Sequence, residues 1–178
     1  MTSSLDFRRP PGADDETPVQ YVWSDLDCYG CGPANPDGFG LESYRVDDAL
    51  VAELDPAPTH TSGGPNAMYG GLLAALVDCQ SIWTAMVAAA EREERPLETV
   101  AEHPCVTGDL HLSYRAPTPL DRPIRVVSEV DGEVGDRTEV ATAVFAVDEL
   151  GGAESEPTVT AEVAAFRVPP ERFGERHG

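Results

Sequence analysis

Hydrophobic and polar residues alternate in short stretches along most of this chain, and one long apolar run interrupts them. The alternation around Leu41–Arg45 and over Ala49–Leu54 predicts two strands, each ended by a turn rich in Pro or Asp. After Pro104 it returns in VTGDLHLSYRAP, PIRVVSEV, TEVATAVFAVDE and PTVTAEVAAFRV, with DGEVGD and LGGAESE as turns. Short connections between these four strands predict an antiparallel meander.

The apolar run extends from about Met68 to Arg92 and predicts one long helix. It contains no Pro, is rich in Ala, Leu, Met and Val, opens with Gly70–Gly71 and closes with the charged run EREERP. A helix with so few polar positions must be covered on most sides. A strongly curved antiparallel sheet wrapped around the helix is the simplest cover, which predicts an α+β fold in the order β-β-α-β-β-β-β.

A transmembrane span is the competing interpretation of this run, which is just long enough to cross a bilayer. Asp78, Gln80 and Ser81 lie at its centre, and its flanks are acidic and contain no Lys. Polar residues at the centre and the absence of flanking Lys are both atypical of a membrane helix. We therefore expect a soluble protein that does not contact a membrane.

The length of 178 residues suits one domain. Residues 1–20 carry Pro, Gly and acids without periodicity and predict a flexible or loosely docked arm; residues 171–178 predict a flexible tail. Residues 21–170 then form a single domain. The first residues, MTSSLDFRRPPGADDE, lack the apolar segment of a signal peptide, so we expect a cytoplasmic protein with reduced cysteines.

The charge of the chain is strongly negative. It has 32 acidic residues and 12 basic ones, for a net charge of −20, and all the basic residues are Arg. Nucleic acid is an unsuitable partner, because phosphate binding requires clustered cations. The hydrophobic content of 41% argues against disorder. We interpret the charge as adaptation to a high-salt cytoplasm, where self-repulsion is screened, and keep a merely acidic mesophilic protein as the alternative.

Asp78 is the candidate functional residue of the helix, since an ionised carboxylate in apolar surroundings costs several kcal/mol unless it is paired or hydrated. A polar pocket around it is the alternative structural explanation. Gly70 and Gly71 add unpaired N–H groups at the positive end of the helix, where an oxyanion or a carbonyl oxygen can approach. Gly70 and Asp78 lie eight residues apart, or about 12 Å along the axis. Cooperation between them therefore requires two chains related by a two-fold axis.

Three stretches carry a resemblance to a known family: CYGCGPANPDGFGL, HTSGGPNAMYGGLLAALVD and VTGDLHLSYRAPTPL. Together with the long helix and the curved sheet, they resemble the hotdog-fold acyl-CoA thioesterases of the phenylacetyl-CoA thioesterase type. The likeness extends from about Cys28 to Val168. Where those relatives usually have His before the two glycines, this chain has Tyr69.

The resemblance implies roles for particular residues. Gly70 donates its N–H to the thioester carbonyl, Asp78 acts as general base or nucleophile, and Thr107 orients the attacking water. Tyr69 and Gly71 line the same substrate site. The side-chain role of the usual His is absent in this chain.

Further residues are implied in substrate binding. Asn66, in the loop before the helix, is expected to make a polar contact. Coenzyme A carries phosphates, so a protein this acidic needs local cations. Arg115 is the one we assign to the site, and the other arginines of the strand region are Arg122, Arg125 and Arg137.

The function implied is hydrolysis of an acyl-CoA thioester at the interface of a homodimer or homotetramer, without a cofactor. A hotdog protein that binds acyl-CoA without hydrolysing it is the first alternative, favoured by Tyr69 in place of His. A dehydratase or hydratase is the second, but it would place His beside the acid, and no His lies near Asp78 in the sequence.

The four cysteines are interpreted as structural, and we predict no metal. Cys28 and Cys31 resemble half of a zinc site, but no second CxxC follows, and Cys79 lies in the predicted helix. A tight glycine-rich turn explains the spacing. Cys105 and His103 flank Pro104 without a third orienting group, which argues against a nucleophilic pair.

Overall fold

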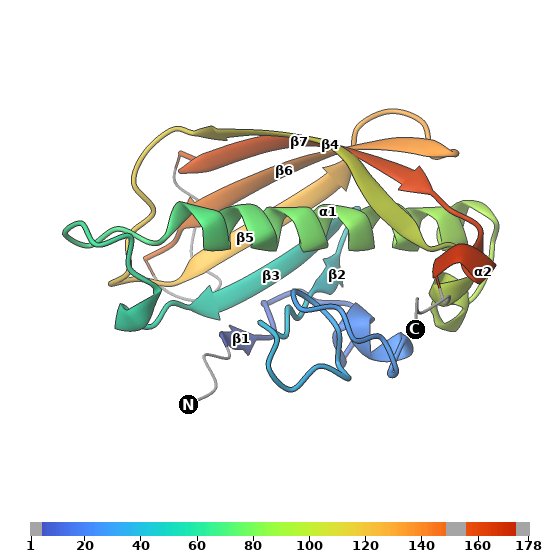
Figure 1. Ribbon diagram of the computed structural model, residues 1–178, viewed down its shortest axis with the longest axis horizontal. Helices are drawn as coiled ribbons and strands as arrows, with labels where there is room; N and C mark the ends of the chain where they lie inside the picture. The colour runs from blue at the N-terminus through green and yellow to red at the C-terminus, as the bar shows by residue number, and fades with distance from the viewer. Residues whose placement is uncertain (1–4, 149–155, 174–178) are drawn as a thin grey trace.

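The computed structural model describes residues 5–148 and 156–173, in which one antiparallel sheet curves around a long helix, α1 (Gly70–Arg92) (Figure 1). This confirms the α+β architecture expected from the sequence. The strands are β1 (Asp6–Arg8), β2 (Tyr44–Val46), β3 (Ala49–Asp55), β4 (Cys105–Tyr114), β5 (Ile124–Val130), β6 (Arg137–Ala146) and β7 (Val159–Arg167). Short helical turns are η1 (Val19–Val22), η2 (Pro58–His60), η3 (Leu97–Glu102) and α2 (Pro170–Phe173).

The strand order differs from the predicted meander in the position of β4. The sheet runs β1-β3-β5-β6-β7-β4, with β2 paired to β3, so of the four strands after the helix β5, β6 and β7 follow one another in the sheet and β4 does not. β4 lies at the edge beside β7, and the connection through residues 115–123 carries the chain back to β5 beside β3. This connection contains three prolines, which cannot supply the N–H groups of a tight hairpin ladder.

α1 supplies much of the core. Its apolar side chains pack against the inner face of the sheet, among them the buried Leu73, Leu76, Val77, Trp83 and Met86. Two hydroxyls of α1 have partners on the sheet: the Ser81 and Thr142 hydroxyls are 2.7 Å apart, and those of Thr84 and Ser128 are 2.6 Å apart. α1 is long and apolar enough to cross a membrane, yet 67% of its most apolar window is buried inside the fold. It is the buried core helix.

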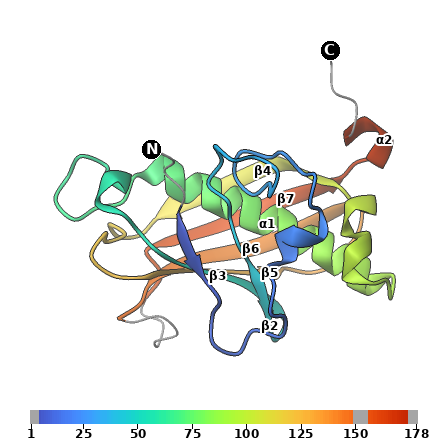
Figure 2. The same cartoon turned by 90° about the horizontal axis from the view of Figure 1, so that it is seen from below.

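The N-terminal segment is not the loosely attached arm that we expected. Residues 6–8 form β1, in which Phe7 pairs with Leu54 of β3. Further along, the segment between η1 and β2 passes over the face of α1 that the sheet leaves open (Figure 2). It is tied there by Ser43, whose hydroxyl donates a hydrogen bond of 2.5 Å to the side-chain oxygen of Gln80. The residues predicted as the tail, 171–178, lie largely outside the described residues.

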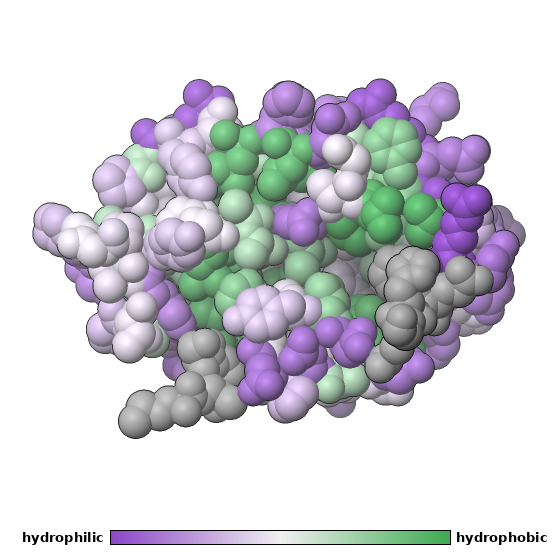
Figure 3. All heavy atoms as spheres, in the orientation of Figure 1, coloured by the Kyte–Doolittle hydropathy of each residue, from purple (hydrophilic) through white to green (hydrophobic). Residues whose placement is uncertain are grey.

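β4 is unusually exposed for a strand of ten residues. It pairs only with β7 in the described part of the chain, so its other edge has free backbone groups. Figure 3 shows apolar residues on the face that carries α1. Large exposed apolar side chains on or near β4 are Val106, Leu110 and Tyr114, together with Tyr69 before α1 and Phe166 on β7. An open edge next to exposed apolar side chains is typical of a surface that another chain covers.

Candidate functional site

The structure brings Asp78 and Thr107 together. Asp78 is half-buried in the middle of α1, and its Oδ1 accepts a hydrogen bond from the Thr107 hydroxyl near the start of β4. A β-bulge between Thr107 and Asp109 shifts the register of β4 against β7 at this point. Gly108 lies in the bulge, and a Cβ there would lie 2.3 Å from the ring of Phe166.

A cavity of about 230 Å³ opens beside this pair. Its walls are mostly apolar and include Trp23, Leu26, Ile82, Trp83 and Met86. A carboxylate and a hydroxyl are thus presented to an otherwise apolar space. This arrangement can hold an apolar group next to a base, which is the requirement for proton transfer on a bound substrate.

The N-terminus of α1 forms a second, separate group. Within the described residues, the amide N–H groups of Gly70 and Gly71 have no backbone acceptor, as expected for the first turn of a helix. The Tyr114 hydroxyl donates a hydrogen bond of 2.7 Å to the Gly70 carbonyl oxygen. The exposed ring of Tyr69 lies over Gly71, where a Cβ would come within 2.6 Å of it. A cavity of about 370 Å³, lined by Met68, Gly70 and Tyr114 among others, adjoins this turn.

These two groups do not meet within one chain. Gly70 and Asp78 belong to one regular helix, so their separation of eight residues corresponds to about 12 Å along its axis. One carbonyl carbon cannot contact both groups at that distance. Tyr114 is a residue that the sequence reasoning did not assign to the site; only its place on the same strand as Thr107 could have indicated it.

Asn66 and Arg115 are held by contacts with the protein. Asn66 has a left-handed backbone (φ 47°), and its Oδ1 accepts a hydrogen bond of 3.0 Å from the amide of Leu120, which joins two loops. Arg115 borders the cavity beside Gly70, while its Nε donates to the Thr160 hydroxyl at 3.1 Å. The Asn66 carbonyl oxygen is therefore occupied, and the Arg115 guanidinium is turned toward β7.

The other arginines proposed for phosphate binding have acidic partners. Arg122 lies 3.5 Å from Asp148, and Arg125 lies 2.5 Å from the fully buried Glu53. Arg137 forms a 2.6 Å ion pair with Glu139. An arginine paired in this way presents less positive charge to a phosphate than a free one does.

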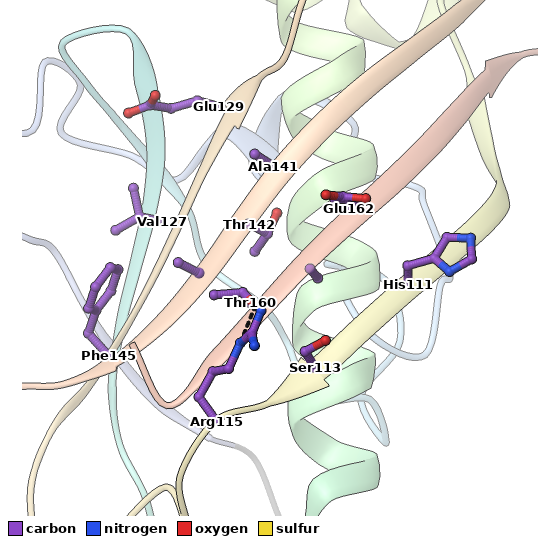
Figure 4. A pocket seen from close by; sticks show the side chains of 12 residues that line it. His111, Ser113, Arg115, Val127, Glu129, Ala141, Thr142, Phe145, Thr160 and Glu162 are labelled. Atoms are coloured by element: carbon purple, nitrogen blue, oxygen red, sulfur yellow. Dashed lines mark hydrogen bonds between the residues drawn. The ribbon is translucent and has the colours of Figure 1, made fainter. Parts of the chain in front are cut away.

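Another cavity lies on the other face of the sheet, away from α1 and Asp78. Its volume is about 610 Å³, and Figure 4 shows His111, Arg115 and Glu162 around it. His111 thus projects from the helix-free face of the sheet. The cavity contains neither Asp78 nor Thr107, so we place the candidate chemistry at the smaller one.

Three cysteines also meet at the cavity beside Asp78. The sulfur atoms of Cys28, Cys31 and Cys79 lie within 4.8 Å of one another. Hydrogen bonds from the Cys31 and Cys79 thiols and from nearby amides lower the pKa of the Cys28 thiol. The sequence showed the CxxC spacing but gave no sign that the helix would bring Cys79 to it.

Cys105 and His103 do not form a nucleophilic pair. The Cys105 thiol donates to the backbone oxygen of His103 at 3.5 Å, while Nδ1 of the His103 ring faces Arg167. Burial raises the pKa of Cys105 to about 11, so this thiol is protonated at neutral pH. This agrees with the interpretation from the sequence.

Comparison with solved structures supports the fold. A scan against protein-family models and a search of the curated proteins give no match. Among solved structures, a thioesterase superfamily protein from Shewanella loihica is 29% identical over 74% of this chain and 93% of its own, with a TM-score of 0.55. A Pseudomonas aeruginosa thioesterase is 9% identical over 89% of this chain and 99% of its own, with a TM-score of 0.61. The chain has the hotdog fold.

A further hotdog neighbour, also a thioesterase superfamily protein, is 16% identical over 90% of this chain and 70% of its own, with a TM-score of 0.58. Most of the chain therefore takes part in the likeness. In this hotdog structure the carboxylate–hydroxyl pair lies at the middle of the central helix, and the free amides lie at its N-terminus.

Proposed function

We propose that this protein is a homodimeric hydrolase of acyl-CoA thioesters. The observation that carries the proposal is the hydrogen-bonded pair of Asp78 and Thr107 at an apolar cavity in a hotdog fold. Thioesterase superfamily proteins among the structural neighbours support the same reaction class. The acyl group would occupy the apolar cavity, and the coenzyme A moiety would extend toward solvent.

The proposed reaction begins with water beside Asp78. The carboxylate accepts a proton from the water, whose oxygen attacks the thioester carbonyl carbon. The oxyanion that forms is stabilised by the free amides of Gly70 and Gly71 at the positive end of a helix. Its collapse breaks the C–S bond, and the departing thiolate takes the proton back. Thr107 holds the carboxylate through its hydroxyl. In the alternative form of this mechanism, the Asp78 carboxylate itself attacks the thioester carbonyl carbon and forms an anhydride, which water then hydrolyses.

Two subunits are needed because, within one chain, Asp78 lies too far from the free amides of Gly70 and Gly71 for both to contact one carbonyl group. In the proposed dimer, β4 pairs in antiparallel fashion with β4 of a second copy across its free edge. A two-fold axis between Leu110 and His111 would set Thr107 opposite Tyr114 of the partner subunit. Since Thr107 contacts Asp78 and Tyr114 contacts Gly70, this register would join the two groups into two equivalent sites. The proposal keeps a homotetramer as the alternative assembly. It also includes a contact between Arg115 and a phosphate group of coenzyme A.

Binding without hydrolysis is the second candidate, and Tyr69 favours it. Its ring covers Gly71 at the turn that would receive the carbonyl oxygen. A tyrosine there can narrow access to the amides while leaving the acyl cavity unchanged.

The test compares the wild type with Asp78→Asn over a panel of acyl-CoA thioesters in molar KCl. Hydrolysis is followed by thioester absorbance, since a thiol reagent would also react with the protein's own cysteines. Loss of a general base predicts a fall in kcat of about 10²- to 10⁴-fold. Asp131→Asn removes the same charge from an exposed position in the turn between β5 and β6 and serves as the matched control. Saturable acyl-CoA binding without wild-type turnover would instead establish the binding protein.

A further inference from the structure

The three-cysteine cluster joins two distant parts of the chain. Cys28 and Cys31 lie in the loop between η1 and β2, and Cys79 lies on α1, directly after Asp78. In the described residues these three sulfurs are within 4.8 Å of one another, and none is in a disulfide. All three line the cavity of about 230 Å³ beside Asp78. Three soft ligands therefore converge on one point.

The turn that carries Cys28 and Cys31 is shaped like a metal-binding turn. The Gly32 amide donates a hydrogen bond of 2.9 Å to the Cys28 carbonyl oxygen, which closes the turn. A Cβ at Gly32 would lie 2.4 Å from the Cys28 nitrogen, so the turn requires glycine there. Two cysteines two residues apart in a tight turn are a common half of a structural zinc site.

Gly30 admits the third sulfur. A Cβ at this position would lie 2.2 Å from the Cys79 sulfur, far inside van der Waals contact. Without a side chain at residue 30, Cys79 reaches the turn from the helix. The close approach of helix and loop at this point is thus built into the sequence, although the residues are separated by about fifty positions.

Trp83 provides an independent observation. Its side chain is fully buried, and its indole N–H has no hydrogen-bond partner of ordinary geometry in the described part of the chain. Trp83 and Cys31 line the same cavity of about 230 Å³. A neutral thiol accepts hydrogen bonds weakly, whereas a metal-bound thiolate carries negative charge, so a bound metal would give this buried donor a suitable acceptor.

We propose that Cys28, Cys31 and Cys79 bind a zinc ion through their three sulfur atoms. Zinc–sulfur bonds of about 2.3 Å in tetrahedral geometry set the sulfur atoms about 3.8 Å apart, so side-chain movements of an ångström or less form the site. Water from the adjoining cavity fills the fourth position. Binding releases the thiol protons to solvent, because the ligands bind as thiolates. The proposal does not depend on the proposed hydrolase activity.

The bound ion would fix the loop to the helix one residue from Asp78. Metal that binds only the folded chain stabilises it by mass action, so removing the ion should lower the melting temperature. The role is structural: the ion holds one wall of the cavity.

The test measures metal in the full chain, purified with reductant in molar KCl. We expect one zinc per chain by elemental analysis, and after exchange with cobalt(II) the thiolate-to-cobalt charge-transfer absorption of a tetrahedral site. Cys79→Ser should lose both. Gly30→Ala keeps every thiol but displaces the Cys79 sulfur, and should bind metal about 10- to 100-fold more weakly. Cys105→Ser changes the fourth cysteine that lines this cavity, which lies outside the three-sulfur cluster, and should bind metal as the wild type does.

Chelation of the wild type provides a measurement that does not depend on folding of a variant. The melting temperature should fall when zinc is removed under reducing conditions and return when zinc is added. A wild type that takes up neither zinc nor cobalt under these conditions would overturn the site. So would equal binding by Cys79→Ser, or a disulfide among the three cysteines that persists in the presence of reductant and zinc.

Discussion

The hydroxyl of Thr107 donates a hydrogen bond to the carboxylate of Asp78, and so connects the exposed edge strand to the middle of the buried helix. The two residues are 29 positions apart. The bond gives the carboxylate a fixed orientation at the cavity. It also links the candidate chemistry to β4, the strand that we propose forms the dimer.

Replacing Thr107 with Val should test this positioning role. The substitution keeps the β-branched shape and removes the hydroxyl, and hydrogen bonds to charged groups contribute about 1.5–3 kcal/mol. We expect kcat to fall about 10- to 100-fold with KM little changed, measured on the best acyl-CoA substrate. Thr107→Ser retains the hydroxyl and should restore most of the rate. Equal kcat for Thr107→Val and the wild type would remove Thr107 from the mechanism.

Mixing two inactive variants should test whether the site is shared. Asp78→Asn removes the acid, and Gly70→Val blocks the helix N-terminus, where even a Cβ would meet the Tyr114 hydroxyl at 3.0 Å. In mixed dimers one site carries both defects and the other carries neither. Random exchange of subunits should therefore restore about a quarter of wild-type activity.

The control for that experiment is each variant exchanged with itself, which should stay inactive. Light scattering should show dimers throughout, and mixed dimers are confirmed by differently tagged chains. Activity that stays at the level of the separate variants, although mixed dimers form, would show that each site lies within one chain.

Lowering the salt concentration should destabilise the protein. The net charge of −20 means that acidic side chains repel one another. This repulsion acts over about a Debye length, which grows from about 3 Å at 1 M salt to about 10 Å at 0.1 M. We expect the melting temperature, followed by circular dichroism, to fall steadily as KCl is diluted. Equal stability in molar and 0.1 M KCl would refute adaptation to high salt.

The ion pair of Glu53 and Arg125 should be important for stability. Glu53 is fully buried on β3, and Arg125 lies opposite it on β5. Glu53→Ala leaves a largely buried guanidinium without this partner, which costs about 3–5 kcal/mol in the free energy of unfolding. Asp55→Ala, on the same strand, breaks an exposed pair with Arg8 and should cost about 1 kcal/mol or less. Denaturant unfolding measures both, and similar losses would contradict this difference.

The elements of the fold could be predicted from the sequence because hydrophobic periodicity is a local property. The long apolar run became α1, and the alternating segments became β3, β5, β6 and β7. Asp78 was recognisable as exceptional for the same reason, since a carboxylate breaks an apolar pattern wherever the helix later packs. The position of β4 was not predictable in this way, because strand pairing depends on the path of the connecting chain.

The candidate site was predictable only in part. The sequence placed Asp78 and Gly70 on one helix and fixed their separation, which already required two chains for a shared site. Only the tertiary structure brought Thr107 to Asp78, turned Arg115 toward Thr160, and paired Arg125 with the buried Glu53. These contacts join residues on different elements, and spacing along the chain carries no information about them.

The cysteines show most clearly what the sequence determined and what only the tertiary structure decided. The sequence determined that Cys28 and Cys31 share a tight turn, because two intervening residues and the following glycine are local features. It could not determine that Cys79 meets them, since that contact depends on how the loop crosses α1. Local patterns set which elements form and which residues are exceptional. Packing of distant segments decided which of those residues meet, because the burial of apolar surface that drives it acts over the whole chain.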